Sequence, residues 1–90
     1  MKLLLCKSCQ DVIRLIPNEV RSCKCGNCSG KYINGIDAVY TGENAVPLGF
    51  ANSTLVSSIR NQPQSGMGSN FTAFVIPVIC PTFKKVDKIE

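Results

Sequence analysis

Five of the six cysteines of this 90-residue chain are crowded into residues 6–28, which limits the possible folds more than any other feature. The first two form a C-x2-C pair, and three more lie in "RSCKCGNCSG" at residues 21–30. The chain has no histidine, so a closed metal site in it would use four cysteine sulfurs. The spacing therefore predicts one site for a metal ion, zinc above all, with one thiol to spare. The five cysteines are Cys6, Cys9, Cys23, Cys25 and Cys28.

Two registers of the second group compete for the metal. Cys25-x2-Cys28 follows the first pair after fifteen residues, a common spacing in four-cysteine zinc sites. Cys23-x-Cys25 is followed directly by Gly26, which suits the tight, positive-φ turn that comes after a ligand pair. The first pair is followed by Gln10, which tolerates such a turn less easily. Cys25 belongs to the site in both registers, and the choice between Cys23 and Cys28 stays open on these grounds.

Other uses of the thiols fit the sequence less well. A disulfide framework would spread its cross-links, whereas the last two-thirds of the chain contain only Cys80, which we expect to be an inert core thiol. Redox chemistry at Cys6-x2-Cys9 is an alternative, since this spacing can lower a thiol pKa. An iron site of the rubredoxin type would use the same four sulfurs as zinc. We therefore expect reduced thiols that hold a metal in the cytoplasm.

The composition predicts a small globular protein. A hydrophobic fraction of 44% and a charged fraction of 18% are typical of a folded chain, but a core of this size is marginal without a metal or a disulfide. "MKLLLC" at the start has three leucines, too few for a signal sequence. No stretch approaches the ~18 apolar residues of a membrane helix. The net charge of +4 permits an acidic partner without requiring nucleic acid.

The segments in and around the cysteine region predict short strands. Residues 10–21, between the cysteine groups, predict a hairpin that turns at Pro17-Asn18. Asn34-Gly35 predicts a second hairpin with a type I′ turn, which needs positive φ at both central residues. Residues 45–50 predict a further extended segment.

The second half of the chain predicts one helix and one apolar strand. Residues 52–62 predict a short helix capped by Asn52 or Ser53, whose apolar stripe needs a packing surface. The stretch "FTAFVIPVICP", at residues 71–81, predicts a central strand that is buried on both faces and bulged at its internal proline. Residues 82–90 predict a charged tail that frays.

These elements together predict an α+β fold in a single domain, residues 1–90. Residues 1–30 would form a four-cysteine zinc ribbon, and residues 31–81 a small, mainly antiparallel sheet covered by the one short helix. Residues 82–90 would follow as the charged tail.

Residues 6–32 resemble zinc-ribbon, or rubredoxin-like, domains. The stretches "RSCKCG", "SGKYI" and "AVYTGENAVPLGFANSTL" extend this likeness to a group of small, mostly uncharacterised proteins of bacteriophages and bacterial mobile regions. That resemblance implies Cys6, Cys9, Cys23 and Cys25 as the ligands and Cys28 as the spare thiol. By analogy it also implies a host-directed role, such as inhibition of a host enzyme or defence complex.

No catalytic constellation accompanies the cysteines. Histidine, the commonest acid–base group, is absent, and the carboxylates of Asp11, Asp37 and Glu43 are scattered. We therefore expect a non-enzymatic zinc protein that binds another protein and has no contact with a membrane. The alternatives are a small nucleic-acid-binding ribbon and a thiol redox protein. The nucleic-acid alternative would use the basic residues of the ribbon, if they share a face: Lys7, Arg14, Arg21, Lys24 and Lys31.

Overall fold

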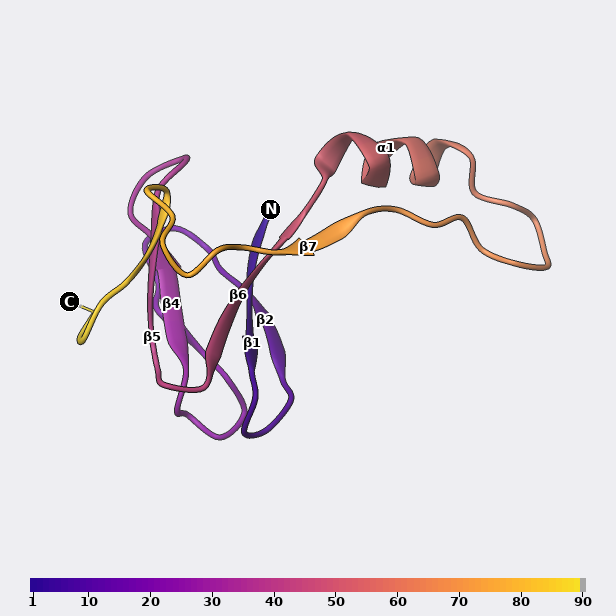
Figure 1. Cartoon of the computed structure of the whole chain (residues 1–90). Coiled ribbons are helices and arrows are strands. Elements are labelled where there is room, and N and C mark those ends of the chain that lie inside the picture. Colours follow the sequence, from indigo (N-terminus) through magenta and orange to yellow (C-terminus); the bar gives the residue numbers. More distant parts are fainter. Residues whose placement is uncertain (90) are drawn as a thin grey trace.

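The computed structural model describes residues 1–89, which form one helix and two four-stranded sheets (Figure 1). The first sheet has the strand order β2-β1-β6-β7 and is antiparallel throughout. The second has the order β3-β4-β5-β8, in which only β5 and β8 are parallel. The α+β class is thus confirmed, with two sheets in place of one. In chain order the elements are β1 (Lys2–Cys6), β2 (Val12–Arg14), β3 (Arg21–Ser22), β4 (Ser29–Tyr32), β5 (Ala38–Thr41), β6 (Ala45–Phe50), α1 (Asn52–Arg60), β7 (Ala73–Val75) and β8 (Phe83–Lys85).

The core lies between the two sheets. Side chains alternate along a strand, so Leu4 and Cys6 of β1 point to the same buried face. From the second sheet, Tyr40 packs edge to face on Phe83, with ring centroids 5.0 Å apart. Sulfur is a substantial part of this core, because Cys23 and Cys28 are buried in the same cluster. The metal-ligand candidates are therefore also core residues.

The hairpin predicted between the cysteine groups is divided between the sheets. β2 pairs with β1, whereas β3 pairs with β4. Only an isolated bridge between Ile16 and Glu19 closes the predicted turn, where Asn18 has a φ of 66°. The segment thus crosses from one sheet to the other instead of forming a hairpin of its own.

The hairpin predicted at Asn34-Gly35 forms between β4 and β5, but its turn is not type I′. Among the described residues, positive φ does not occur at Asn34 or Gly35. The side-chain oxygen of Asn34 instead accepts hydrogen bonds from the amides of Ile36 (2.8 Å) and Asp37 (2.7 Å). The predicted turn type is wrong because an Asn side chain can replace a backbone carbonyl in closing a turn.

The helix α1 stands away from the sheets instead of covering them (Figure 1). None of its residues is buried, and the side chains of Val56 and Ile59 are exposed. Its N-cap is Ala51, without a side-chain cap, so the predicted capping by Asn52 or Ser53 is wrong. We call α1 and residues 61–72 the arm.

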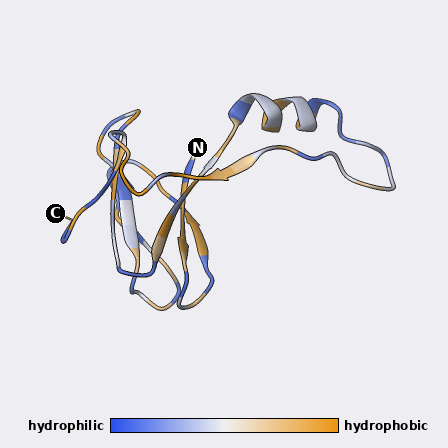
Figure 2. Cartoon of the chain, viewed as in Figure 1, coloured by the Kyte–Doolittle hydropathy of each residue, from blue (hydrophilic) through white to orange (hydrophobic). Residues whose placement is uncertain are grey.

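The apolar stretch after the arm is an edge strand. β7 covers only Ala73–Val75, all three residues are exposed, and the strand pairs on one side with β6. Beyond the buried Ile76, the side chain of Ile79 is 91% exposed. The prediction of a buried central strand is therefore wrong, since β1 and β6 occupy the centre of this sheet. Figure 2 shows the hydrophobic colour of β7 at the root of the arm.

The segment predicted to fray adds a strand to the second sheet. β8 runs parallel to β5, and the amide of Val86 donates to the carbonyl of Tyr40 (2.8 Å). Phe83 is completely buried. The prediction of fraying is wrong for these residues, because one aromatic side chain in a charged segment is enough to fasten it to the core. Nearby, Cys80 is only half-buried, with its sulfur 3.5 Å from the hydroxyl of Thr82.

Replacing Phe83 with alanine should therefore lower the free energy of unfolding by about 3–5 kcal/mol, the usual cost of removing a buried aromatic ring. Denaturant unfolding followed by circular dichroism measures this loss. The control is Ile79→Ala, at a 91% exposed side chain, which should change stability by less than about 0.5 kcal/mol. Equal, small effects of both changes would contradict the packing of β8.

Candidate metal centre

The first cysteine pair lies in the hairpin loop between β1 and β2. The last pair in the ladder before the loop is Leu5 with Val12. The next step is a hydrogen bond from the amide of Cys6 to the carbonyl of Asp11 (2.9 Å). Inside the loop that this bond closes, the amide of Gln10 donates to the carbonyl of Cys6 (2.7 Å), and Gln10 has a φ of 61°. We call this loop, residues 6–11, the first knuckle.

The second cysteine group lies in the equivalent loop of the other sheet, between β3 and β4. Here the last pair in the ladder is Ser22 with Ser29. The amide of Cys23 then donates to the carbonyl of Cys28 (2.9 Å), the same bond across five positions as in the first knuckle. The amide of Gly26 donates to the carbonyl of Cys23 (3.0 Å), and Gly26 has a φ of 80°. Residues 23–28 are the second knuckle.

The three thiols of the second group occupy different positions in their knuckle. Cys6 and Cys23 each open a knuckle, and Cys28 holds the closing position that Asp11 holds in the first. A left-handed residue follows directly after Cys9 and after Cys25. The turn expected of Gly26 is thus present, and the glutamine in the first knuckle makes the same kind of turn.

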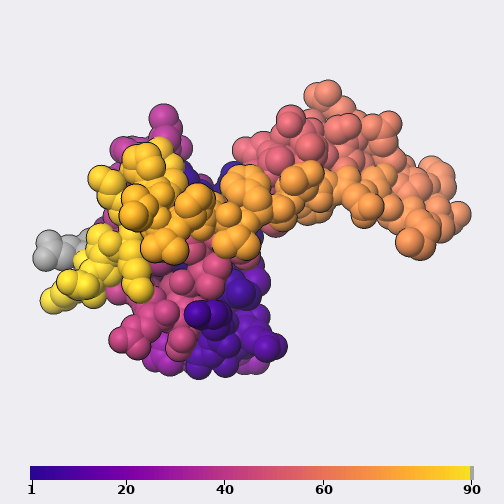
Figure 3. All heavy atoms as spheres, viewed as in Figure 1, coloured from indigo at the N-terminus to yellow at the C-terminus, as the bar shows by residue number. Residues whose placement is uncertain are grey.

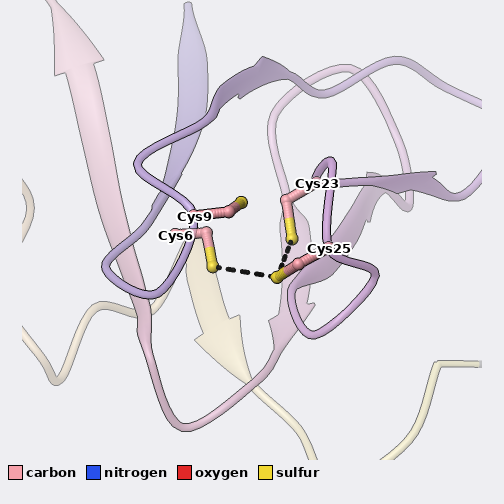
Figure 4. A group of neighbouring side chains, drawn as sticks. All are labelled: Cys6, Cys9, Cys23 and Cys25. Atoms are coloured by element: carbon pink, nitrogen blue, oxygen red, sulfur yellow. Dashed lines mark hydrogen bonds between the residues drawn. The ribbon is translucent and has the colours of Figure 1, made fainter.

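Four sulfurs from the two knuckles converge on one point (Figure 4). The Sγ atoms of Cys6, Cys9, Cys23 and Cys25 all lie within 4.8 Å of one another. The Cys6 and Cys25 sulfurs are 3.7 Å apart, and those of Cys23 and Cys25 are 3.5 Å apart. Four zinc–sulfur bonds of about 2.3 Å in tetrahedral geometry place the sulfurs about 3.8 Å apart. The four cysteines are thus positioned to bind a metal ion.

Cys28 lies beside this group but not in it. Its side chain is fully buried in the core, while its backbone amide donates to the Sγ of Cys23 (3.3 Å). Gly42 packs against it closely: a Cβ at this position would lie 3.1 Å from the Cys28 sulfur and 2.6 Å from the Asn27 carbonyl oxygen. The structure therefore brings Cys23, and not Cys28, together with the other three cysteines.

A carboxylate ties the two knuckles together. The backbone amide of Lys24, between the two cysteines of the second knuckle, donates to Oδ2 of Asp11 (2.9 Å). The sequence marked Asp11 only as one of several scattered carboxylates. Its position two residues after Cys9 was the available signal, but the partner amide lies thirteen residues further on. Contacts of this kind orient ligands and tune a metal site from outside the ligand set.

Hydrogen bonds to sulfur lower the pKa values of the two cysteines that open the knuckles. The backbone amide of Cys9 lowers the pKa of Cys6. Burial acts to raise the pKa of Cys23, but the amide of Cys28 and the thiol of Cys25 bring it down to about 6. Cys23 is therefore a thiolate at neutral pH, the form in which sulfur binds metals.

The other two thiols hold their protons more tightly. The amide of Asn27 acts to lower the pKa of Cys25, but the hydrogen bond of its thiol to Cys23, together with burial, raises this pKa to about 11. Burial, followed by interaction with Cys6 and Cys23, raises the pKa of Cys28 to about 12. Binding of a metal would thus release a proton from Cys25, while Cys28 stays a neutral core thiol.

Comparison with known proteins adds no further information on the site. No protein-family model, curated protein or solved structure matches the chain. The zinc-ribbon resemblance is supported by the cysteine geometry alone, and the wider resemblance to bacteriophage proteins has no support. Across residues 1–89 there is no helix with the length and apolarity needed to cross a membrane.

Alanine at Cys23 and alanine at Cys28 should have opposite effects on metal binding. Cys23→Ala removes a converging sulfur and should abolish stoichiometric binding, whereas Cys28→Ala should retain about one metal ion per chain. Mass spectrometry of the native protein and elemental analysis measure this ratio. Retention of metal by Cys23→Ala together with its loss from Cys28→Ala would assign the fourth ligand to Cys28.

Proposed function

We propose that the two knuckles hold one structural zinc ion through Cys6, Cys9, Cys23 and Cys25. The observation that carries this proposal is the convergence of these four sulfurs to within 4.8 Å. Four thiolates in a tetrahedral arrangement suit zinc, and a site closed by four protein ligands has no open position for catalysis. Its contribution is folding free energy, which a small core needs.

The zinc ion would join the two sheets. Cys6 is the last residue of β1 in the first sheet, and Cys23 follows β3 of the second. Each sheet thus supplies one knuckle, and the ion would cross-link two hairpins that are separate in sequence. Reduced thiols are required for this role, which supports a cytoplasmic location.

Iron and redox chemistry are the competing uses of the same sulfurs. Ferric iron bound by four cysteines absorbs visible light and zinc does not, so a protein that holds metal and stays colourless after oxidation in air contradicts the iron hypothesis. A redox protein needs an accessible thiolate, whereas Cys6 and Cys23 are buried, and the exposed Cys25 keeps its proton because its pKa is raised to about 11. Burial and protonation of these thiols therefore favour a structural role.

The purified protein should contain about one zinc ion per chain, because the site has four sulfur ligands. Removal of the metal with a chelator should unfold residues 1–89 cooperatively, which circular dichroism and amide NMR spectra would detect. Cys9→Ser should act like the chelator, and Cys80→Ser, outside the two knuckles, serves as the matched control. A metal-free protein with unchanged thermal unfolding would contradict the structural role.

We further propose that the protein acts by binding another protein and not as an enzyme. Large apolar side chains are exposed on the arm and after it, among them Ile59, Met67, Phe71, Val75 and Val78. Exposed apolar surface of this kind is typical of interaction sites. A host-directed modulator of an enzyme or defence complex is the most specific form of this proposal, and it rests on the resemblance to phage proteins.

The basic residues do not support a single nucleic-acid-binding face. Lys7 and Lys24 lie in the two knuckles, but Arg14 pairs with Leu3 at the opposite end of β1. Lys31 belongs to β4 of the other sheet. These cationic groups are thus spread over both sheets and both knuckles, whereas nucleic-acid-binding domains gather them on one face or along one helix.

Fluorescence anisotropy with labelled DNA and RNA oligonucleotides should accordingly show no more than weak binding at low salt. Any such binding should be the same for Arg14→Gln and Lys24→Gln, since Arg14 lies in β2 and Lys24 in the second knuckle. Tight binding that falls steeply between about 50 and 200 mM salt would instead favour the nucleic-acid-binding alternative.

A further inference from the structure

One edge of the first sheet has backbone groups with no partner among the described residues. The amide of Ala51 donates to the carbonyl of Thr72 (2.8 Å), and the amide of Ile76 donates to the carbonyl of Pro47 (2.9 Å). The N–H and C=O groups of the even-numbered residues in this segment therefore point toward β6. In an antiparallel ladder the N–H and C=O groups of the odd-numbered residues point the other way. The N–H and C=O groups of Ala73 and Val75 are directed away from the sheet. Figure 3 shows this segment (orange) at the surface.

The other three sheet edges carry charges, as is usual for protein edges that avoid pairing. β2 contains Arg14, β3 contains Arg21, and β8 contains Lys84 and Lys85. β7 has the sequence Ala-Phe-Val and no charged residue. It is the edge without this protection.

The neutral region extends well beyond β7. Arg60 is the one charged residue between positions 44 and 83, although the whole chain has a net charge of +4. Two copies that met through this region would bring few like charges together. The same neutrality gives no attraction to an acidic protein or to a nucleic acid.

We propose that two copies of this chain pair antiparallel through their β7 edges, about a two-fold axis at Ala73. An unpaired antiparallel edge is complementary to its own copy, because a two-fold rotation places each outward N–H opposite an outward C=O. Pairing of this kind joins the first sheet of one copy to the first sheet of the other in one continuous sheet. It is independent of which metal the knuckles bind.

The positions of the exposed side chains fit an axis at Ala73. Phe71 of one copy would lie opposite Val75 of the second, two residues on either side of the axis. Met67 and Ile79, whose side chains are 92% and 91% exposed, both lie six residues from Ala73. The axis thus brings the Met67 end of one copy toward the Ile79 end of the other. Pro77 has no amide, so the pairing of backbone groups ends at Val75.

Two variants should weaken this interface in different ways. Val75→Lys places a charge on an exposed position of the edge. Ala73→Pro removes an outward N–H at the first residue of β7, a position where an edge strand tolerates proline without losing its ladder to β6. The matched control is Ile36→Lys: the side chain of Ile36 is 67% exposed and that of Val75 is 66% exposed, but Ile36 lies in the β4–β5 loop.

Sedimentation velocity and light scattering over a range of protein concentrations test the pairing. We expect a monomer–dimer equilibrium for the original chain and for Ile36→Lys, with dimerisation at least about tenfold weaker in Val75→Lys and Ala73→Pro. Circular dichroism and metal content, measured on the same samples, identify a variant that fails to fold. If Val75→Lys fails to fold, the dimerisation of Ala73→Pro tests the proposal. A fully metal-loaded monomer at every concentration, or equal dimerisation of all variants, would overturn the proposal. A monomer that instead binds a strand of a different protein at β7 would overturn it too.

Discussion

The closing hydrogen bond of each knuckle is the constraint on which the arrangement of the molecule depends. In both sheets a hairpin ladder ends in a bond from a cysteine amide to a carbonyl five residues later. Inside the loop that this bond closes, the chain makes a left-handed turn directly after the second cysteine. Because the two hairpins face each other, their loops meet at one end of the core, where the four sulfurs converge. The packing of the two sheets therefore also determines the geometry of the candidate metal site.

The surplus thiol follows from the same repeat. Cys28 closes the second knuckle as Asp11 closes the first, and in neither knuckle does the closing residue contribute to the four converging sulfurs. Its side chain then enters the core, and the glycine at position 42 leaves room for it. Burial also keeps it a neutral thiol, with a pKa of about 12. Two cysteines five residues apart thus lie in different surroundings, Cys23 among the four converging sulfurs and Cys28 in the hydrophobic core.

Charge is distributed as unevenly as sulfur. The compact body holds nearly all the charged residues, including those on three of its four sheet edges. The arm and β7 are almost neutral and expose apolar side chains. A body that presents a neutral, unpaired strand suits recognition by backbone hydrogen bonds better than recognition by charge. The proposed protein-binding role and the proposed pairing of two copies both depend on this division.

The sequence by itself determined the features that depend on neighbours along the chain. Cysteine spacing and Gly26 point to a four-sulfur site because a knuckle is a local turn, and the helix at α1 appears for the same reason. Tertiary structure alone decided which strands are central and which are edges. The apolar run at residues 71–81 has the composition of a buried strand, yet β7 is exposed because β1 already pairs with the other side of β6. Phe83, in a segment that looks like a charged tail, is buried because β5 offers it an edge and Tyr40 a partner. Burial depends on what the rest of the chain places nearby, which no local pattern of residues records.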